Sequence, residues 1–427
     1  MPSNSVLHTF HKMKSFFNFI YKSLKFFLWT VLAILIIVNL LILLSGKLYI
    51  YKGVRHTYLV GKMGPGIYDL AIFPKTTISK ASKKSILIIP SDYNSFKLSI
   101  NDSKLMKDME TKAFLVLRGD TVLFEKYFSE HTQQTISNSF SAAKTVVALL
   151  VGIAVEEGKI KSLDEPVGNY ITEFKSGGKE KITIRHLLMM SSGLDWEESA
   201  SNPLSENAES YYGWNLRGLV VNQNAIDVPG KKFNYQSGNS QLLGYILEKA
   251  TGKSVSVYTQ EKIWKVIGAG NDAYWSMDTD AGDEKSFCCL YATALDFARI
   301  GLLINQNGKW KSKQVVPEWY MKEMAVPTNI TTDEGLPNFR YGLHIWTYPY
   351  MNQMISYCRG IKGQYIISIP KENIVIVRLG MKRMDNFVIP ESRQNDMKYV
   401  NKNKQNVGHP ADFFEYIRIG REIAFGK

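Results

Sequence analysis

The chain reads Ser141-Ala-Ala-Lys-Thr-Val-Val-Ala-Leu-Leu-Val-Gly-Ile-Ala-Val155 at its most informative point. Beyond Lys144 the run consists of residues compatible with a helix, and Gly152 is its only breaker. A serine at the start of a helix and a lysine three residues later lie on the same face. The pattern therefore predicts an apolar helix that presents Ser141 and Lys144 side by side.

This spacing suits a nucleophile and its base. Ser141 would lie where backbone N–H groups are unpaired and the helix dipole favours developing negative charge. A Lys144 ammonium desolvated beside an apolar helix can lose its proton near neutral pH and activate the serine. The spacing recurs at Ser176–Lys179 and Ser368–Lys371, where a Gly pair and a Pro exclude a buried helix. Taken alone, the tetrapeptide is equally compatible with an N-cap serine beside a solvated lysine.

The charge of the chain is concentrated near its N-terminus. The 427 residues carry a net charge of +13, and residues 1–60 contain seven Lys or Arg and no acidic residue. The rest of the chain is thus only mildly basic. Because the basic excess flanks an apolar run, we interpret it as membrane-flanking charge and expect no nucleic-acid partner.

Residues 26–44 read FFLWTVLAILIIVNLLILL and predict a transmembrane anchor. Nineteen helical residues span about 28 Å, close to the hydrocarbon thickness of a bilayer. No small-x-small cleavage site follows Leu44, which favours an uncleaved anchor over a signal peptide. Lysines flank both ends, but a short basic tail over residues 1–25 suits retention in the cytoplasm. We expect a single-pass membrane protein whose catalytic domain is extracytoplasmic, on the periplasmic or outer face.

The cysteine and histidine content predicts neither a disulfide framework nor a metal site. Cys288, Cys289 and Cys358 are the only cysteines, adjacent cysteines rarely pair, and an odd number leaves a free thiol. The seven histidines are scattered and match no metal-binding spacing. We expect no metal and no other cofactor.

Strand patterns occur at both ends of the region that follows the anchor. A stalk and accessory segment is expected over residues 45–110, followed by the main domain over residues 111–427. Its middle, from about residue 160 to 320, has mainly helical patterns. The predicted class is α/β (α+β): an antiparallel sheet from N- and C-terminal segments, flanked by helices, with a helical insertion. The expected strands are 113–118 and 121–128 around a Gly-Asp turn, then 354–358, 365–369 and 374–379, and a final helix covers 411–425.

Several stretches, in order, resemble the serine β-lactamase-related hydrolase family, particularly its class C β-lactamase and 6-aminohexanoate-dimer hydrolase branch. The resemblance runs from about residue 112 to 425 and implies a β-lactamase/transpeptidase-like fold. The nucleophile motif is matched by residues 140–145 and the second catalytic motif by residues 233–238. Residues 182–194 resemble a helix that the family carries between these motifs, and residues 360–365 resemble the nylon-hydrolase branch.

The resemblance implies a role for each residue of a catalytic set. Ser141 is the nucleophile, Lys144 its base and Tyr235 a second general acid/base, while Ser237 is polar toward the lysine and the substrate. A phenol can have its pKa pulled down by an adjacent ammonium, so we expect Tyr235 to titrate below its ordinary value. His186 is interpreted as a structural helix residue.

The third motif departs from the family. Penicillin-binding members carry Lys-Thr-Gly on the strand beside the site, whereas the equivalent strand here, residues 355–359, has no lysine. By alignment, the backbone N–H groups of Ser141 and Cys358 would form the oxyanion hole. Substrate-binding roles are expected for Arg359, Gly360 and Lys362 at the end of this strand. They are also expected for Asp195 and Trp196, which follow the Ser191-Ser-Gly193 turn.

These observations together predict a membrane-anchored serine hydrolase that cleaves amide or ester bonds of small or peptide-like substrates through an acyl-serine intermediate. The alternative is a catalytically weak, penicillin-binding-like peptide sensor or binding protein of the cell envelope. The substrate stays open among β-lactams, D-amino-acid peptides, linear amides and esters. Because the third-motif cation is missing, we expect esterase or amidase activity to exceed β-lactamase activity.

Overall fold

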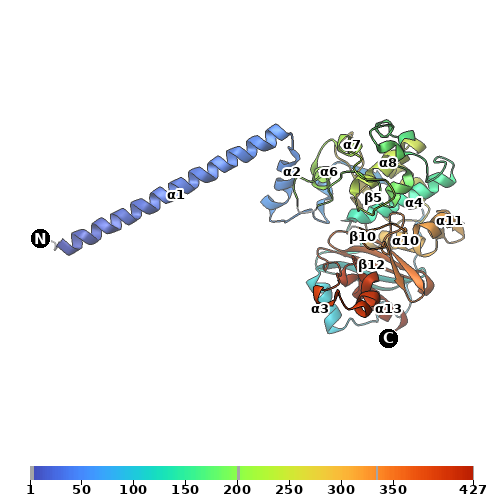
Figure 1. Cartoon of the computed structure of the whole chain (residues 1–427). Helices are drawn as coiled ribbons and strands as arrows, with labels where there is room; N and C mark the ends of the chain where they lie inside the picture. Colours follow the sequence, from blue (N-terminus) through green and yellow to red (C-terminus); the bar gives the residue numbers. More distant parts are fainter. Residues whose placement is uncertain (1–3, 200–201, 333–334, 427) are drawn as a thin grey trace.

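The centre of the fold is a six-stranded antiparallel sheet in the order β3-β2-β12-β11-β10-β9. The computed structural model describes residues 4–199, 202–332 and 335–426 (Figure 1). The predicted strands and the Gly-Asp hairpin are confirmed, so both ends of the hydrolase region build one sheet. The strands are β2 (Thr111–Arg118), β3 (Thr121–Tyr127), β9 (Trp346–Tyr350), β10 (Gln353–Gly360), β11 (Gln364–Ile369) and β12 (Ile374–Gly380).

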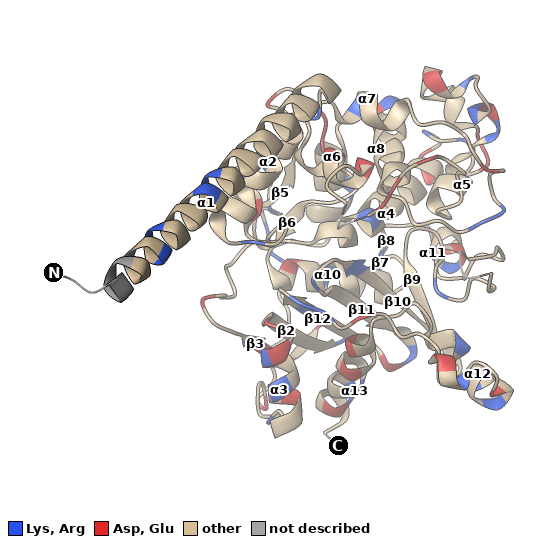
Figure 2. Cartoon of the chain, turned by 60° about the vertical axis from the view of Figure 1, so that its left-hand side comes forward, with Lys and Arg blue, Asp and Glu red and all other residues tan. Residues whose placement is uncertain are grey.

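Helices cover both faces of this sheet (Figure 2). One face is covered by α10 (Ala294–Asn305), and the other by α13 (Ala411–Phe425), which is the predicted final helix. Successive residues of β12 point to opposite faces, so Val375 meets α10 while Ile376 meets α13. This explains why the strand is apolar at nearly every position: neither of its faces is exposed to solvent.

A second sheet, in the order β1-β5-β6-β4, was not predicted. It comprises β1 (Lys75–Ile78), β4 (Ser137–Asn138), β5 (Ala273–Ser276) and β6 (Leu290–Ala292). The expectation of a mainly helical middle region is therefore incomplete, because strands of two to four residues carry too little pattern to be recognised. Since β1 precedes the hydrolase region, the accessory segment is built into the domain.

The helical layer packs around α4 (Ala143–Glu156), whose residues 143–154 are all buried. Beside it lies α8 (Ser237–Thr251), which ends at Gly252 in the left-handed conformation that favours glycine. Thr183 caps α5: its hydroxyl accepts a hydrogen bond from the His186 N–H, and the His186 ring in turn accepts one from the Thr183 N–H. The remaining α-helices of this half are α5 (Ile184–Leu188), α6 (Glu206–Tyr212), α7 (Leu216–Val221), α9 (Val255–Thr259) and α11 (Glu318–Met324), and those of the sheet half are α3 (Ile100–Asp108) and α12 (Met397–Asn403).

The N-terminal helix α1 (Asn4–Ser45) projects from the domain, and the short helix α2 (Tyr49–His56) follows it (Figure 1). The stretch His11–Ser45 is long and apolar enough to cross a bilayer. Its most apolar 18-residue segment has a mean hydropathy of 2.9, and no part of that segment is buried. The helix starts well before residue 26, so the basic segment is helical from Asn4 onward.

The expectation that adjacent cysteines stay unpaired is wrong for this chain, because Cys288 and Cys289 form a disulfide. Cys289 has φ 65°, so the backbone turns sharply at this position. Cys358 is free and buried, in agreement with the expected free thiol.

Candidate active site

Ser141 lies on a short 3₁₀ turn, η3 (Phe140–Ala142), directly before α4. Strand β4 holds the entry to this turn, because the Asn138 side chain accepts a hydrogen bond from the Phe140 N–H at 2.8 Å. Phe140 has φ 46°, which is rare for a bulky residue and is typical of functional sites where the surroundings enforce it. The turn presents Ser141 at the junction between the six-stranded sheet and the helical layer.

Lys144 is fully buried one turn after the serine, and its ammonium group has three oxygen neighbours. Nζ lies 3.1 Å from Ser141 Oγ, 3.0 Å from Ser237 Oγ and 2.6 Å from the carbonyl oxygen of Phe287. Burial lowers the pKa of Lys144 from 10.5 to about 8. The predicted proximity of Ser141, Lys144 and Ser237 is thus present in the structure.

Glu198 completes this network, and sequence reasoning missed it. Its carboxylate accepts hydrogen bonds from the Ser237 N–H at 2.6 Å, the Ser237 hydroxyl at 2.7 Å and the Trp196 indole N–H at 2.8 Å. Its negative charge partly opposes the lowering of the Lys144 pKa. The one available signal was an acidic residue two positions beyond Trp196, in a loop without periodicity.

Tyr235 lies against the same lysine, whose Nζ is 5.3 Å from the centre of the tyrosine ring. The ring packs on Trp346 and Tyr341. Burial raises the pKa of the Tyr235 phenol, and a hydrogen bond with Ser141 only partly opposes this effect. The expected lowering of its pKa is therefore wrong: desolvation and the negative charge of Glu198 outweigh the Ser141 hydrogen bond and the Arg359 charge, and the phenol keeps its proton at neutral pH.

Strand β10 approaches the nucleophile turn closely at Gly360. A Cβ at this position would lie 2.2 Å from the carbonyl oxygen of Ser139, so only glycine permits the contact. Ile361 follows and lines a cavity of about 110 Å³ in front of the serine. The other residues that line this cavity are Pro65, Phe140, Ser141, Glu198, Ser199, Asn207, Ala208, Tyr211, Tyr212, Ser237, Phe287 and Cys288.

Comparison with known proteins agrees with this geometry. The family model described as Beta-lactamase matches residues 103–383, which is well over half of the chain. The chain belongs to the beta-lactamase family.

Its relatives are hydrolases. The 6-aminohexanoate-dimer hydrolase of Paenarthrobacter ureafaciens is 27% identical over 285 residues, covering 63% of this chain and 72% of that protein. A Bacillus anthracis protein described as a 6-aminohexanoate-dimer hydrolase superposes with a TM-score of 0.66 at 21% identity, covering 84% and 93% of the two chains. A family VIII carboxylesterase gives a TM-score of 0.55 at 16% identity, with coverage of 75% and 99%. Within the beta-lactamase family, this chain is a serine hydrolase with the predicted fold.

The hydrogen-bond register of β10 does not fit the oxyanion role expected for Cys358. Tyr350 and Gln353 close a two-residue hairpin over Met351 and Asn352, both with positive φ, so Gln353 bonds to β9. Backbone N–H groups of alternate residues along β10 point to opposite neighbouring strands. Since the N–H of Gln353 points to β9, that of Cys358, five residues later and paired with Ile366, points to β11. The Cys358 N–H therefore points away from Ser141, and the alignment assigned the oxyanion hole to the wrong residue of β10.

Arg359 and Lys362, which were expected to bind substrate beside the third motif, do not line the cavity. The Arg359 guanidinium stacks 3.4 Å above the Trp346 ring and donates to the carbonyl of Gly408. Burial lowers the pKa of Lys362, an effect that the charges of Asp69 and Glu110 partly oppose, and Lys362 is not among the residues that line the cavity.

Of the two residues expected after the Ser-Ser-Gly turn, neither lines the cavity. Asp195 accepts hydrogen bonds from the backbone N–H of Asn224 at 2.8 Å and from its side chain at 2.7 Å, so its carboxylate pins a loop. Trp196 is buried and acts through Glu198, as described above.

Proposed function

We propose that this chain is a membrane-anchored serine hydrolase that cleaves amide or ester bonds through an acyl-Ser141 intermediate. Lys144 serves as the base, Tyr235 as the general acid, and Ser237 with Glu198 positions the lysine. The observation that carries this proposal is the buried Lys144 amine, with its pKa lowered to about 8, lying 3.1 Å from Ser141 Oγ.

The neighbours of Lys144 direct its lone pair toward the nucleophile. The Ser237 hydroxyl donates its proton to Glu198, so its oxygen only accepts from Lys144, and the Phe287 carbonyl can only accept. Two N–H groups of a neutral amine satisfy these acceptors. The lone pair then faces Ser141 Oγ and takes its proton as the oxygen attacks the substrate carbonyl.

The phenol of Tyr235 supplies the proton for the leaving group, because burial keeps it protonated. For the oxyanion hole we propose the N–H groups of Ser141 and Ile361. Ile361 lines the cavity, and by the alternation along β10 its N–H faces away from β11. Water then hydrolyses the acyl-serine by the reverse proton transfers.

The test is labelling and turnover by the full-length protein. A fluorophosphonate probe should label the parent and not Ser141→Ala, and a p-nitrophenyl ester should be hydrolysed continuously in a Lys144-dependent way. Equal labelling of parent and variant would reject the proposal. A single persistent acyl adduct without turnover would instead favour the peptide-sensor alternative.

We propose that α1 anchors the protein and that the hydrolase domain lies outside the cytoplasm. The apolar stretch and the short basic segment before it support this orientation. The Cys288–Cys289 disulfide supports it as well, because disulfides persist in oxidising compartments. Active alkaline phosphatase fused after residue 427 would agree with this topology, and a fluorescent cytoplasmic fusion with inactive phosphatase would reverse it.

We propose weak β-lactamase activity for the same site. The Arg359 guanidinium stacks on Trp346, and among the described residues that line the cavity none is Lys or Arg. A charge-assisted hydrogen bond to a β-lactam carboxylate contributes about 1.5–3 kcal/mol, so its absence costs roughly ten- to a hundredfold. Nitrocefin turnover as efficient as that of the best ester would contradict this expectation.

A further inference from the structure

A second cavity adjoins the one in front of Ser141. It has a volume of about 100 Å³ and lies between α2 and the segment around α6. Pro65, Ala208 and Tyr212 line both cavities. The two cavities are therefore adjacent, with these three residues between them, and the second one lies on the side of the domain where α1 ends.

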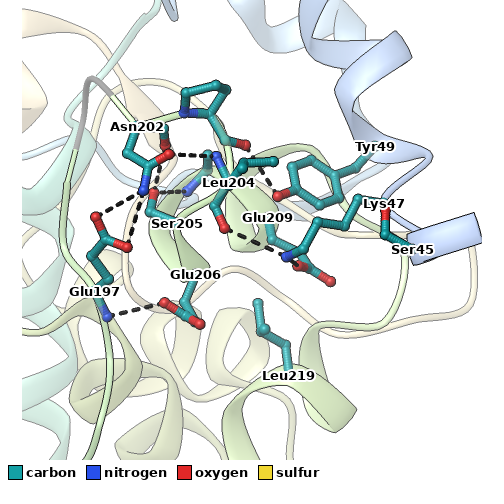
Figure 3. Close-up of polar contacts among 12 residues, drawn as sticks. Ser45, Lys47, Tyr49, Glu197, Asn202, Leu204, Ser205, Glu206, Glu209 and Leu219 are labelled. Carbon is teal, nitrogen blue, oxygen red and sulfur yellow. Dashed lines mark hydrogen bonds and ion pairs between the residues drawn. The ribbon is translucent and has the colours of Figure 1, made fainter. Parts of the chain in front are cut away.

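Polar contacts clamp the segment after α1 onto this part of the domain (Figure 3). Lys47 pairs with Glu209 of α6 at 3.1 Å, and the Tyr49 hydroxyl donates to the carbonyl of Pro203 at 3.1 Å. In α2, Gly53 faces the Tyr212 ring, where a Cβ would lie at 3.4 Å. The walls of the second cavity thus come from the anchor side and from the domain side.

The second cavity opens next to the membrane-spanning helix. Tyr51 of α2 donates a hydrogen bond to Asn39 of α1 at 2.7 Å. Asn39 lies six residues, or about 9 Å of helix, before Ser45, so α2 runs beside the last turns of the apolar helix. If α1 spans a bilayer, α2 lies at the level of the lipid headgroups.

The rim of this cavity is apolar and exposed. Tyr58 is 61% exposed and Met63 is 88% exposed, and both line the cavity. Between them, Leu59 and Val60 are 75% and 58% exposed. Four exposed apolar side chains within six residues are unusual on the surface of a soluble protein and suit the interface of a bilayer.

We propose that the two cavities form a path for the acyl chain of a membrane amphiphile, whose ester or amide carbonyl then lies at Ser141. The inference rests on the proposed hydrolase function and specifies its substrate class. The bilayer beside α1 supplies the chain, which enters past Tyr58 and Met63 and lies along α2. Ser141 Oγ bonds to the acyl carbon, the alcohol or amine leaves with the Tyr235 proton, and water releases the fatty acid.

The experiment compares short and long acyl chains on the full-length protein in phosphatidylethanolamine–phosphatidylglycerol vesicles. The parent should hydrolyse p-nitrophenyl decanoate at least about tenfold more efficiently than the acetate, because buried methylenes favour binding. Gly53→Leu fills the second cavity and should lower kcat/KM for the decanoate roughly tenfold while leaving the acetate within about twofold. Arg55→Leu adds the same side chain at an exposed position of α2 that does not line the cavity and should change neither.

Equal rates for both chain lengths in the parent, or a decanoate preference that survives Gly53→Leu, would overturn the inference. Should Gly53→Leu lose the acetate activity as well, Val54→Trp, which fills the same cavity from the next residue, decides the matter by the same criteria. Acetate hydrolysis that is unchanged in Ser141→Ala would instead reject the proposed function. The two failures are therefore distinguishable.

Discussion

Replacing Lys144 by methionine removes a buried charge and should change how stability depends on pH. The pKa of Lys144 is about 8 in the folded protein and 10.5 as its ordinary value. Between these values the unfolded state binds more protons, so the parent gains stability as pH rises. At about 1.4 kcal/mol per pKa unit, the full effect is about 3 kcal/mol, of which about 2–3 kcal/mol falls between pH 7 and pH 10.

The assay is urea denaturation of parent and Lys144→Met, followed by tryptophan fluorescence, at about pH 7 and about pH 10. The packing and hydrogen-bond changes of the substitution do not vary with pH, so they cancel in the comparison. From pH 7 to pH 10, the free energy of unfolding of the parent should rise by about 2–3 kcal/mol relative to that of the variant. The rate of ester hydrolysis by the variant should be roughly a hundred- to ten-thousandfold lower than that of the parent. A stability difference that is the same at both pH values would refute the assignment of a lowered pKa to Lys144.

Three further substitutions examine other parts of the structure. Glu198→Gln removes a charge that raises the Lys144 pKa, so the rising limb of the kcat/KM profile, set near pH 8, should move to lower pH; an unmoved limb would contradict the network. Gly360→Ala forces a Cβ to within 2.2 Å of a backbone oxygen, and a loss of about 1–3 kcal/mol in urea denaturation together with reduced ester turnover is expected. Asp296→Ala leaves the buried guanidinium of Arg299 without its partner at 3.0 Å, which should cost about 3–5 kcal/mol in the same measurement; a cost under about 1 kcal/mol would show that the pair is dispensable.

The sequence predicted those parts of the site that depend on local spacing. Ser141 lies on the 3₁₀ turn that leads directly into α4 and Lys144 lies in the first turn of α4, so their proximity follows from the local helical geometry alone. Tyr235 and Ser237 were assigned through the family resemblance, because no local pattern connects them to Ser141. The main sheet was predictable as well, since its strands are long, apolar and separated by clear turns.

The remaining features depend on tertiary structure. Glu198 reaches Ser237 through a loop whose path no periodicity encodes. The direction of the Tyr235 pKa shift depends on burial, which a list of neighbouring charges does not reveal. The oxyanion assignment to Cys358 does not fit the structure because alternate residues of a strand face opposite neighbours, so an alignment offset by an odd number of residues, here three from Ile361, reverses the direction of the N–H.

The pairing of β1 with β5 has a consequence for how the chain is made. Ile78 and Ala273 are partners although about 195 residues separate them. At a synthesis rate of about 5–20 residues per second, β5 emerges roughly 10–40 s after β1. During that interval β1 has no partner, and the second sheet cannot form until β5 has been synthesised. Proteolytic release of the enzyme by a cut between residues 79 and 110 would then remove an edge strand from the mature domain, so shedding is expected to inactivate it and not to liberate a working hydrolase.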